Sequence, residues 1–389
     1  STTGKTIELP IKSTLIEWFS TLEYFIATHG WRKGKSDTAL KTAQSWYLTR
    51  RLVDASQNII VKEYDCKTLH YKTVSRNDKK ENFSDSFEDT IYSHTLASDV
   101  KDSSGKVIIP ARTIIDTQTL KIINDYNIDT VNIRSVLTCE VEGWVCQTCY
   151  GLDLGLNKQV EIGTPVGIIA AQSIGEPGTQ LTMRTFHSGW VAKEGWDMTQ
   201  GLSRVEELFE ARNPKITAEV ADIDGVITIK HDDAGAIVQL TSTGLNDEEY
   251  YFAEDLEVLV REGQEIKEKH VIARHKTEKQ KVVAGFAGIV KKISKGMIVV
   301  KDSKPRSFDY RFELWRNILV RDGESVKVGQ KLVEGYINLS RLMQVAGTLT
   351  SEQYIVNEIK SIYSSQGQTV NSKHIELVVR QMFSRVRVL

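Results

Sequence analysis

Four side chains of different chemistry recur at helical spacing near the middle of the chain: Gln180, Met183, Arg184 and His187. In a helix over residues 180–187 they stand at i, i+3, i+4 and i+7, which is one face. That face could grip a nucleoside triphosphate, with methionine on the base, arginine on phosphate and histidine as proton donor to the leaving group. The alternative interpretation is an ordinary amphipathic helix whose polar face lies in water.

The segment just before these residues reads Gly175-Glu176-Pro177-Gly178. Glycine is conformationally free, and proline removes a helical hydrogen bond. We therefore expect a break here, between the preceding apolar run and the four side chains. Such a break would act as a hinge and allow the segment to move.

The chain has four cysteines: Cys66, Cys139, Cys146 and Cys149. Cys146 and Cys149 form a C-x2-C pair of the kind that makes a chelate turn around tetrahedral zinc, and the other two ligands can come from anywhere in the fold. In an intracellular chain disulfides are disfavoured, which leaves a metal site or unrelated buried thiols. The spacing favours the metal site, and the ion would then hold residues 139–151 in their fold.

Good helix formers dominate residues 21–61, which contain no proline and are predicted to form one long helix. Its threonines and serines 38, 42, 45 and 49 fall on one slim polar face, which a backbone or a nucleic-acid duplex could approach closely. A basic stripe on the same helix could contact phosphates, or could simply be a solvated face. The stripe consists of Arg32, Lys33, Lys35, Lys41, Arg50 and Arg51.

The length and composition of the chain exclude few classes of protein. A chain of 389 residues has room for roughly two to four domains. Its net charge of -1 and pI of 6.7 give no overall sign of nucleic-acid binding. No apolar run approaches the roughly 18 residues needed to span a bilayer, so we expect a soluble cytoplasmic protein. The chain starts without Met and stops after a helical segment, so we expect a piece of a longer polypeptide.

The second half of the chain changes character. Between residues 216 and 338, Val, Ile and Thr alternate with charges and glycine turns recur, which predicts a largely β domain. Residues 259–273 and 319–333 share a strand, turn, strand pattern around an acid-Gly turn, a layout similar to the barrel-sandwich hybrid of biotinyl and lipoyl carriers. Residues 339–389 return to helical spacing. The predicted class is therefore α+β and multidomain.

Three stretches carry a resemblance to a known family. AAQSIGEPGTQLTMRTFH, residues 170–187, resembles the trigger loop of the largest subunit of multisubunit RNA polymerase in its bacterial form, beta prime. GLSRVEELFEARNPK, residues 201–215, resembles the second trigger helix and its exit. THGWRKGKSDTALKTAQSWYLTRRLVD, residues 28–54, resembles the bridge helix, and some similarity extends over the whole chain.

The resemblance implies a division of the chain into named parts. These would be a lead-in segment (1–20), the bridge helix (21–61), a zinc-binding region with a mixed α/β insertion (62–163), the trigger loop (164–215), a β-rich jaw (216–338) and a truncated C-terminal helical segment (339–389).

The resemblance also implies an activity, DNA-templated RNA synthesis by nucleotidyl transfer. Gln180 would contact the ribose, Met183 the base, Arg184 the phosphates and His187 the β-phosphate of the incoming nucleotide. The four cysteines would hold one structural Zn²⁺. The implied substrate or template contacts on the long helix are Arg32, Lys33, Lys41, Thr42, Tyr47 and Arg50.

One element of the family pattern is missing. The Asn-Ala-Asp-Phe-Asp-Gly-Asp motif that binds the two catalytic Mg²⁺ ions in this family does not occur in the sequence. The upstream part of the subunit would have to bind them, and this chain alone would be inert. The implied partners are DNA template, RNA, nucleoside triphosphates, the beta and omega subunits, the alpha dimer and a sigma factor, in a nucleoid-associated enzyme.

The tryptophans stand at unexpected positions. Trp46, Trp144 and Trp190 occupy places where the family pattern has glycine, Trp18 usually matches glycine, and Trp31 and Trp196 match small residues. Glycine serves where φ is positive or another group comes close, and tryptophan replaces it poorly. We therefore hypothesise that the gene uses UGA for glycine and that these tryptophans are glycines in the natural protein. The alternative is genuine tryptophans tolerated by local changes.

A function of another class also fits the motifs. The chain could be a non-enzymatic, zinc-braced scaffold that binds nucleic acid or resembles a carrier domain. That interpretation predicts that no activity depends on His187.

Overall fold

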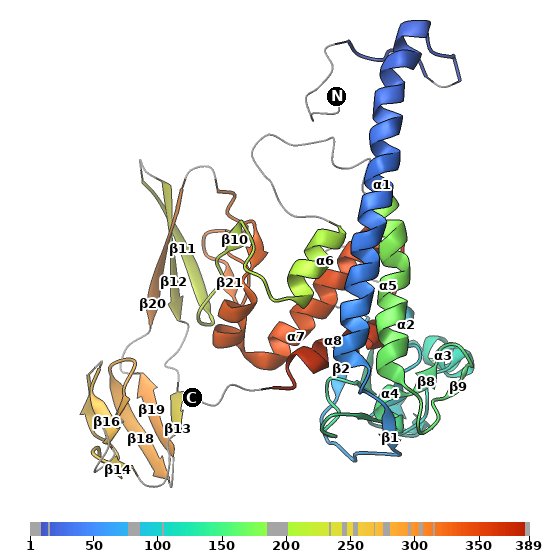
Figure 1. The fold of residues 1–389 in the computed structure, drawn as a ribbon. Coiled ribbons are helices and arrows are strands. Elements are labelled where there is room, and N and C mark those ends of the chain that lie inside the picture. The colour runs from blue at the N-terminus through green and yellow to red at the C-terminus, as the bar shows by residue number, and fades with distance from the viewer. Residues whose placement is uncertain are drawn as a thin grey trace. The chain divides into compact units, whose positions relative to one another are not determined.

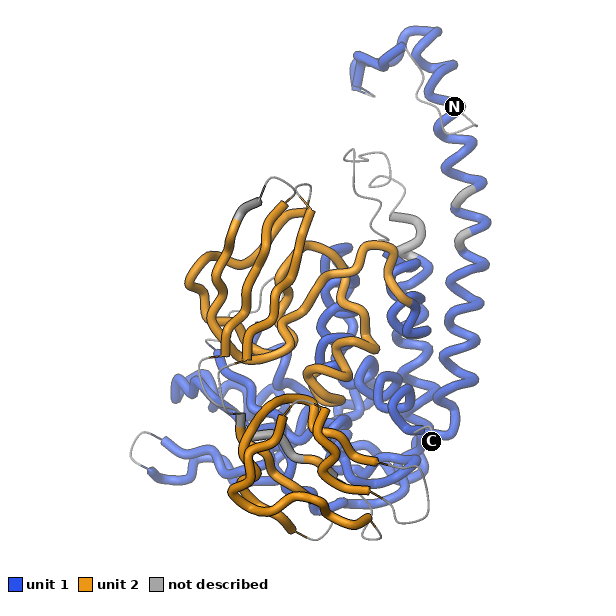
Figure 2. Tube along the Cα trace, turned by 90° about the vertical axis from the view of Figure 1, so that its left-hand side faces the viewer, with its two compact units in different colours: residues 1–212, 351–389 blue, residues 213–350 orange. Residues whose placement is uncertain are grey.

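The computed structural model describes residues 9–14, 16–76, 86–102, 105–184, 201–232, 235–242, 247–251, 256–267, 269–274, 281–294, 297–302, 306–313 and 316–385. The chain forms two compact units, Ser1–Arg212 with Ser351–Leu389, and Asn213–Thr350 (Figure 2). Helices and strands both contribute, in agreement with the predicted α+β class. Among the helices of the described ranges, none is both long and apolar enough to cross a membrane.

The first unit is organised around one long helix, α1 (Thr21–Ser56). It begins with a capping box, in which the Ser20 hydroxyl accepts from the Glu23 N–H and the Glu23 carboxylate accepts from the Ser20 N–H at 2.9 Å. The sequence predicted a helix that ends at Val61, but α1 ends five residues earlier, at Ser56. The reason is strand pairing: Val61 is fully buried in β1 (Val61–Glu63), which runs parallel to β7 (Val145–Cys146).

A second helix, α5 (Val166–Arg184), lies side by side with α1 (Figure 1). The expected break at residues 175–178 is wrong, because α5 continues through Pro177 as one helix. A Cβ atom on Gly175 would lie 2.1 Å from Thr49 Oγ1, and one on Gly178 would lie 3.0 Å from Ser45 Oγ. These glycines let the two helices approach closely, and this packing outweighs their weak helix propensity.

The slim polar face of α1 faces the backbone of α5. Near its end, the Ser56 hydroxyl donates to the Gly167 carbonyl at 2.9 Å, and a Cβ on Gly167 would lie 1.9 Å from the Ser56 carbonyl oxygen. Further along, the hydroxyls of Ser45 and Thr179 are 3.3 Å apart. Of the two occupants expected for this face, a helix backbone is the one seen along residues 45–56.

The close approach at Gly175 gives a stability prediction. Changing a helical glycine to alanine normally stabilises a protein by about 0.5–1 kcal/mol. Gly175→Ala should instead destabilise by about 1–3 kcal/mol, because its methyl group would overlap Thr49. Gly30→Ala on α1 is the matched control, since a Cβ there meets nothing within 4 Å. Urea unfolding of the two variants should give changes of opposite sign, and equal changes would contradict tight packing of α1 on α5.

The cysteines lie in a mixed α/β region between α1 and α5 that has two hydrophobic cores. The first core, around Ile91, Leu96 and Ile133, lies between α2 (Phe87–Ile91), α3 (Thr117–Asp125) and a sheet of order β2-β6-β3. The second surrounds the cysteines. The strands and short helix of this region are β2 (Lys72–Ser75), β3 (Thr95–Leu96), β4 (Val100–Lys101), β5 (Val107–Ile109), β6 (Thr130–Arg134), β8 (Leu152–Asp153), β9 (Lys158–Gln159) and α4 (Gln147–Tyr150).

The described ranges contain three further helices. They are α6 (Leu202–Phe209), α7 (Leu339–Ser365) and α8 (Ser372–Met382). The sequence predicted helices from residue 339 onward, and α7 and α8 are present there. Gly347 has a φ of 81° and divides α7 into two segments. The helix α8 packs against both α1 and α5 and is almost wholly buried over residues 372–379.

The second unit is mostly β structure with two separate cores, where the sequence suggested one β domain. The first core, around Ile227 and Val238, belongs to a sheet of order β20-β12-β11-β21. The second, around Ile298 and Val300, belongs to sheets of order β13-β19-β18-β15 and β14-β16-β17. The strands are β10 (Thr217–Ala218), β11 (Gly225–Asp232), β12 (Gly235–Ser242), β13 (Asp247–Tyr251), β14 (Glu257–Val258), β15 (Glu265–Ile266), β16 (Val271–Arg274), β17 (Lys281–Val283), β18 (Gly288–Ser294), β19 (Met297–Asp302), β20 (Ser307–Glu313), β21 (Ser325–Val326) and β22 (Tyr336–Ile337).

The internal repeat of this unit adopts the same local structure twice, once beside each core. The two acid-Gly turns place Gly263 and Gly323 at φ values of 81° and 78°. In each copy the residue after the glycine accepts, through its side chain, a backbone hydrogen bond from an arginine N–H. The pattern of residues 259–273 and 319–333 therefore reflects a real structural repeat.

Candidate metal centre and paired helices

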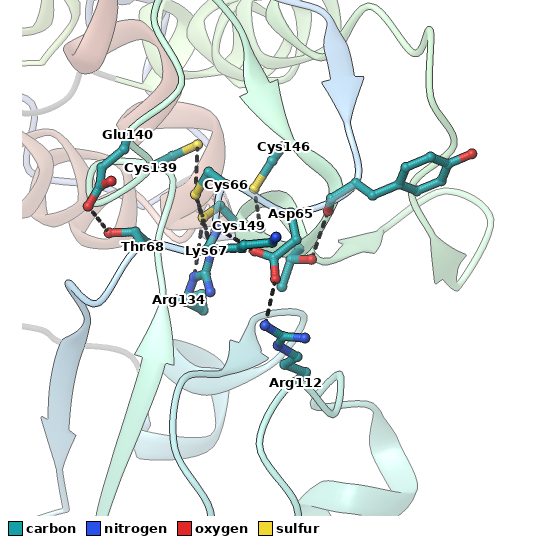
Figure 3. Close-up of polar contacts among 12 residues, drawn as sticks. Asp65, Cys66, Lys67, Thr68, Arg112, Arg134, Cys139, Glu140, Cys146 and Cys149 are labelled. Atoms are coloured by element: carbon teal, nitrogen blue, oxygen red, sulfur yellow. Dashed lines mark hydrogen bonds and ion pairs between the residues drawn. The ribbon is translucent and has the colours of Figure 1, made fainter.

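The four cysteines lie together at the end of α1 (Figure 3). Their sulfur atoms are all within 4.8 Å of one another, and no disulfide joins them. Cys66 follows β1, Cys139 closes a turn after β6, Cys146 caps α4, and Cys149 lies within α4. The Cys149 N–H donates to the Cys146 sulfur at 3.3 Å, which is the chelate turn expected of a C-x2-C pair.

This donor set suits a metal ion that prefers thiolates. Cys146 and Cys149 are fully buried, and contact with the sulfur of Cys139 raises the pKa of Cys146 to about 11. The sulfurs of Cys139 and Cys146, together with burial, also raise the pKa of Cys149. The thiols of Cys146 and Cys149 would therefore hold their protons at neutral pH unless a cation displaced them, whereas hydrogen bonds with Cys146 and Cys149 lower the pKa of Cys139. The arrangement can bind one metal ion with no ligand position left open.

A buried arginine that sequence reasoning missed lies against the cluster. Arg134 donates from Nη2 to the sulfurs of Cys66 and Cys149, each at 3.2 Å, and from Nε to Cys149 at 3.4 Å. Burial lowers the pKa of Arg134, but the charge and hydrogen bonds of Cys149, together with the contacts of Asp65 and Cys66, raise it by more. This side chain would offset part of the negative charge of a four-thiolate site.

An aspartate fixes the position of that arginine. Asp65 accepts from Arg134 at 2.9 Å and from the Lys67 N–H at 2.9 Å, and it pairs with Arg112 at 3.2 Å (Figure 3). Burial raises the pKa of Asp65, but these partners lower it by more, so the carboxylate is charged at neutral pH. No sequence motif announces this pair, because the two residues are far apart in the chain and join only through the fold.

The cysteine region connects the end of α1 to the start of α5. The Val61 N–H donates to the Thr164 carbonyl at 3.1 Å, and the Gly163 N–H donates back to Val61 at 2.7 Å. The Gly167 N–H, in the first turn of α5, donates to Ile59 at 3.0 Å. The four-cysteine centre is thus built onto the junction of the two packed helices.

A loop of the cysteine region is held by α8. Arg380 donates to the carbonyls of Cys139 and Trp144, each at 3.0 Å, and to that of Val141. The Lys62 ammonium lies 4.1 Å from the centre of the Trp144 ring. The Trp144 Nε1 is buried, and no described residue gives it a hydrogen-bond partner. An unpaired buried indole N–H is unfavourable, which is what a side chain foreign to the site would show.

The structure also bears on the other unexpected tryptophans. Trp18 has a φ of 64°, a conformation that glycine adopts freely and tryptophan rarely. Trp31 and Trp46 project from α1 and are 53% and 69% exposed. Trp190 and Trp196 lie outside the described residues. The backbone at Trp18 and the orphaned indole of Trp144 both favour glycine in the natural protein.

Mass spectrometry of protein made in the source organism tests this hypothesis. Peptides that contain residues 18, 46 and 144 should have the masses expected for glycine, whereas the peptide of residues 216–230, which contains no tryptophan, sets the expected mass accuracy. Tryptophan masses at these positions, or UGG codons in the gene, would contradict the hypothesis that these residues are glycines.

The basic residues predicted on α1 have different environments. Arg32, Tyr47 and Arg50 are exposed, and the Thr42 hydroxyl donates to the Thr38 carbonyl at 2.7 Å within the helix. Lys33 is half-buried, and the Lys41 side chain lies outside the described residues. Arg32, Tyr47 and Arg50 are therefore accessible to a ligand of α1.

Arg51, which the sequence placed in the same basic stripe, is not available in this way. Its guanidinium pairs with Glu206 at 3.4 Å and with Glu210, both from the α6 region. Arg204 of α6, which is 1% exposed, pairs with Glu207 at 3.2 Å and with Glu358 of α7 at 3.7 Å. These ion pairs hold α6 between α1 and α7, and charge counting along α1 alone does not reveal them.

The predicted nucleotide-gripping residues lie at the limit of what the structure describes. Gln180, Met183 and Arg184 belong to the last turns of α5, but their side chains lie outside the described atoms. His187 lies outside the described residues. The structure therefore places the backbone of the first three beyond the α1 contact at Gly178, and their roles remain a prediction.

The chain is similar to known proteins over nearly its whole length. Residues 19–389 match the family described as RNA polymerase Rpb1, domain 5. The chain is 42% identical over 392 residues to the DNA-directed RNA polymerase subunit beta' of Roseiflexus castenholzii, covering 99% of this chain and 26% of that protein. It is 40% identical over 395 residues to a Dehalococcoides mccartyi subunit beta', covering 99% and 30%. The chain thus spans between a quarter and a third of these relatives.

Proposed function

Because the chain belongs to the RNA polymerase Rpb1 domain 5 family, we propose that it is part of a DNA-directed RNA polymerase, a nucleotidyltransferase of transcription. The single observation that carries the proposal is the packing of α5 on α1 through Gly175 and Thr49. Residues 180–184 are the last turns of α5, the helix that packs on α1. The exposed surface of α1 carries Arg32, Tyr47 and Arg50. Substrate-gripping residues and a basic template-facing helix are what templated nucleotide addition requires.

In the proposed reaction the 3′ hydroxyl of RNA attacks the α-phosphate of a nucleoside triphosphate, and pyrophosphate leaves. Gln180 would contact the ribose, Met183 would pack on the base, Arg184 would neutralise the phosphates, and His187 would protonate or neutralise the leaving β-phosphate. The segment after α5 would close over a matched nucleotide, exclude water and test the shape of the base pair. Gly175, Pro177 and Gly178 do not interrupt α5, which is continuous up to Arg184.

The face of α1 would position the template and substrate. Arg32, Lys33, Lys41 and Arg50 would neutralise phosphates. Thr42 and Tyr47 would lie next to the template base. Arg51 would serve the enzyme differently, by holding α6 through Glu206 and Glu210.

The four cysteines would hold one structural Zn²⁺. Four thiolates are a donor set that zinc favours, and the buried Arg134 beside them suits the negative charge of such a centre. The ion would brace the junction of α1 and α5 and take no part in the chemistry. The catalytic Mg²⁺ ions would be bound by the upstream part of the subunit, since the sequence here lacks their aspartate motif.

The proposed partners follow from the family. The chain would act with the upstream part of its own subunit, the beta and omega subunits, the alpha dimer and a sigma factor. Together they would bind DNA template, RNA and nucleoside triphosphates in the cytoplasm, at the nucleoid. Residues 216–338 would form the jaw near downstream DNA.

Reconstitution tests the proposal. The 389-residue chain alone should incorporate no nucleotide, whereas the same chain assembled with the upstream part of the subunit and the other subunits should extend RNA on a DNA template in the presence of Mg²⁺. Assembly with the chain omitted is the control. RNA synthesis that is equally fast without this chain would contradict the proposed function.

A further inference from the structure

The loop that separates two of the cysteines has few bonds of its own. Residues 140–144 lie between Cys139 and the turn that carries Cys146. Within the described ranges, no backbone group of residues 140–144 bonds to another backbone group. The Glu140 carboxylate accepts from the Thr68 hydroxyl at 2.6 Å. Because buried backbone groups need partners, side chains must hold this loop and the ligands beside it.

Arg380, in the last turn of α8, binds the backbone of this loop. Its Nη1 donates to the Trp144 carbonyl at 3.0 Å. Its Nη2 donates to the Cys139 carbonyl at 3.0 Å and to the Val141 carbonyl. A guanidinium presents its donors in a fixed plane, so the three carbonyls keep fixed positions relative to one another. One side chain thus holds the beginning, the middle and the end of the loop.

The helix that carries Arg380 is itself firmly docked on the cysteine region. Glu376, one turn before Arg380, is fully buried and accepts from the Ser135 hydroxyl at 2.8 Å and from the Lys72 ammonium at 3.3 Å. Lys373, two turns before Arg380, is also fully buried and donates to three backbone carbonyls at 2.9–3.0 Å. Undocking α8 would leave these buried charges without partners, which is strongly unfavourable. Arg380 therefore acts on the loop from a rigid support.

A cavity of about 940 Å³ lies beside this loop. Its wall combines residues 140–144 and Cys66 with Gln381, Ser384 and Arg385, which follow Arg380 in the chain. Of the four cysteines, Cys66 alone lies on this wall, and the other three are buried. Movement of the loop away from α8 would therefore open the cysteine centre to water along the cavity.

We propose that Arg380 is a positioning residue of the metal centre, which slows release of the ion by holding residues 139–144 against α8. The inference rests on the proposed zinc centre. With its three carbonyls bound, the loop keeps Cys139 beside the other thiols, and without Arg380 this ligand is free to move away. Coupling between two sites is reciprocal, so metal binding would also stabilise the docking of α8, which packs against α1 and α5.

Transfer of zinc from the loaded 389-residue chain to an excess of the chromogenic chelator pyridylazoresorcinol tests the proposal. Arg380→Met removes the hydrogen bonds and the charge. Arg380→Lys keeps the positive charge, which the buried Glu352 of α7 also experiences, but one ammonium does not span three carbonyls. Both variants should release zinc about 10- to 100-fold faster than the wild type. A wild-type rate in Arg380→Lys would show that only the charge matters and would overturn the proposal.

Arg385→Met is the matched control for these rates. Arg385 is exposed on the wall of the same cavity, so this variant removes a neighbouring charge and leaves the loop held by Arg380. It should release zinc at the wild-type rate. Release as fast as that of Arg380→Met would overturn the proposal, because any positive charge beside the cavity would then suffice.

Hydrogen exchange separates a loosened loop from general unfolding. In zinc-loaded Arg380→Lys, residues 139–146 should exchange faster than in the wild type, whereas β6 should exchange at the wild-type rate. Faster exchange in both segments would show that Arg380 supports the whole region, and would overturn the positioning role. A wild type that binds zinc but releases it as fast as Arg380→Lys would overturn this inference alone. A wild type that binds no zinc would contradict the metal centre itself, and this inference with it.

Discussion

Replacing His187 by alanine in the assembled polymerase should slow the addition of a matched nucleotide by about 10²- to 10⁴-fold. The expected loss is that of a general acid, or of a positioned charge, at the leaving β-phosphate. Rapid-quench measurement of single-nucleotide addition gives the rate, and filter binding gives the affinity for DNA. The affinity should change little, because His187 is proposed to act only when the segment has closed on a nucleotide.

A second histidine serves as the control for this measurement. His70 is exposed on the cysteine region, where its imidazole lies 3.9 Å from Glu140, and it has no proposed role in the reaction. His70→Ala should add nucleotides at the normal rate. Parallel loss of DNA binding and addition rate in His187→Ala would show that the residue supports structure, and the non-enzymatic scaffold would then become the better interpretation.

Replacing Cys149 by serine should release the bound ion and unfold residues 139–151. In zinc-finger peptides the binding of structural zinc contributes about 10–16 kcal/mol, which is comparable to the whole stability of a typical domain. Cys149 is fully buried and touches the Cys66 sulfur at 3.6 Å, so a hydroxyl there leaves the other three sulfurs without their fourth partner. Zinc content by elemental analysis and hydrogen exchange of this segment measure the two effects.

A neighbouring variant distinguishes metal loss from local disturbance. Thr148→Ser keeps the hydroxyl that donates to the Tyr64 carbonyl at 2.8 Å and leaves all four thiols in place. It should retain the ion and its protection from exchange. Chelation of the wild-type protein should reproduce the Cys149→Ser result. Carefully prepared wild-type protein that contains no metal, yet protects residues 139–151, would refute the metal centre.

The sequence was sufficient for features that depend on residue type and short spacing. The C-x2-C pair Cys146 and Cys149 indicated a chelate turn, and the four sulfurs do meet. The small hydroxyl residues Ser45 and Thr49 indicated a face for close approach, and α5 lies there. In both cases the chemistry of the side chain leaves few alternative uses, so the pattern carries most of the information.

The sequence misled where tertiary packing outweighed local preference. Gly175 and Pro177 suggested a hinge because both weaken an isolated helix, yet α5 runs through them. Glycine has two uses, freedom of the backbone and absence of a side chain, and only the neighbouring helix shows which one applies. Tyr363 also holds α5 near these residues, because its hydroxyl donates to the Ile174 carbonyl at 2.8 Å. This contact joins residues that are distant in the chain.

The supporting charges could not be predicted at all. Arg134 and Asp65 form a pair beside the cysteines only because β6 and the loop after β1 meet in the fold. Likewise, the sequence does not distinguish Arg51 from its exposed neighbour Arg50, because the ion-pair partners of Arg51 lie far along the chain on the α6 region. A lone charged residue has no sequence signature that separates a solvated side chain from a buried ion pair.

The most direct test of the central claim is template-dependent photocrosslinking in the assembled enzyme. A nucleoside triphosphate with a photoreactive base should label two peptides, one containing residues 180–187 and one containing residues 41–50 of α1, when it matches the template. A mismatched analogue should label neither peptide appreciably. Labelling of both peptides with the matched analogue alone is the predicted result. Labelling that ignores the template, or that falls only outside these two segments, would contradict closure of the α5 segment onto a nucleotide held against α1.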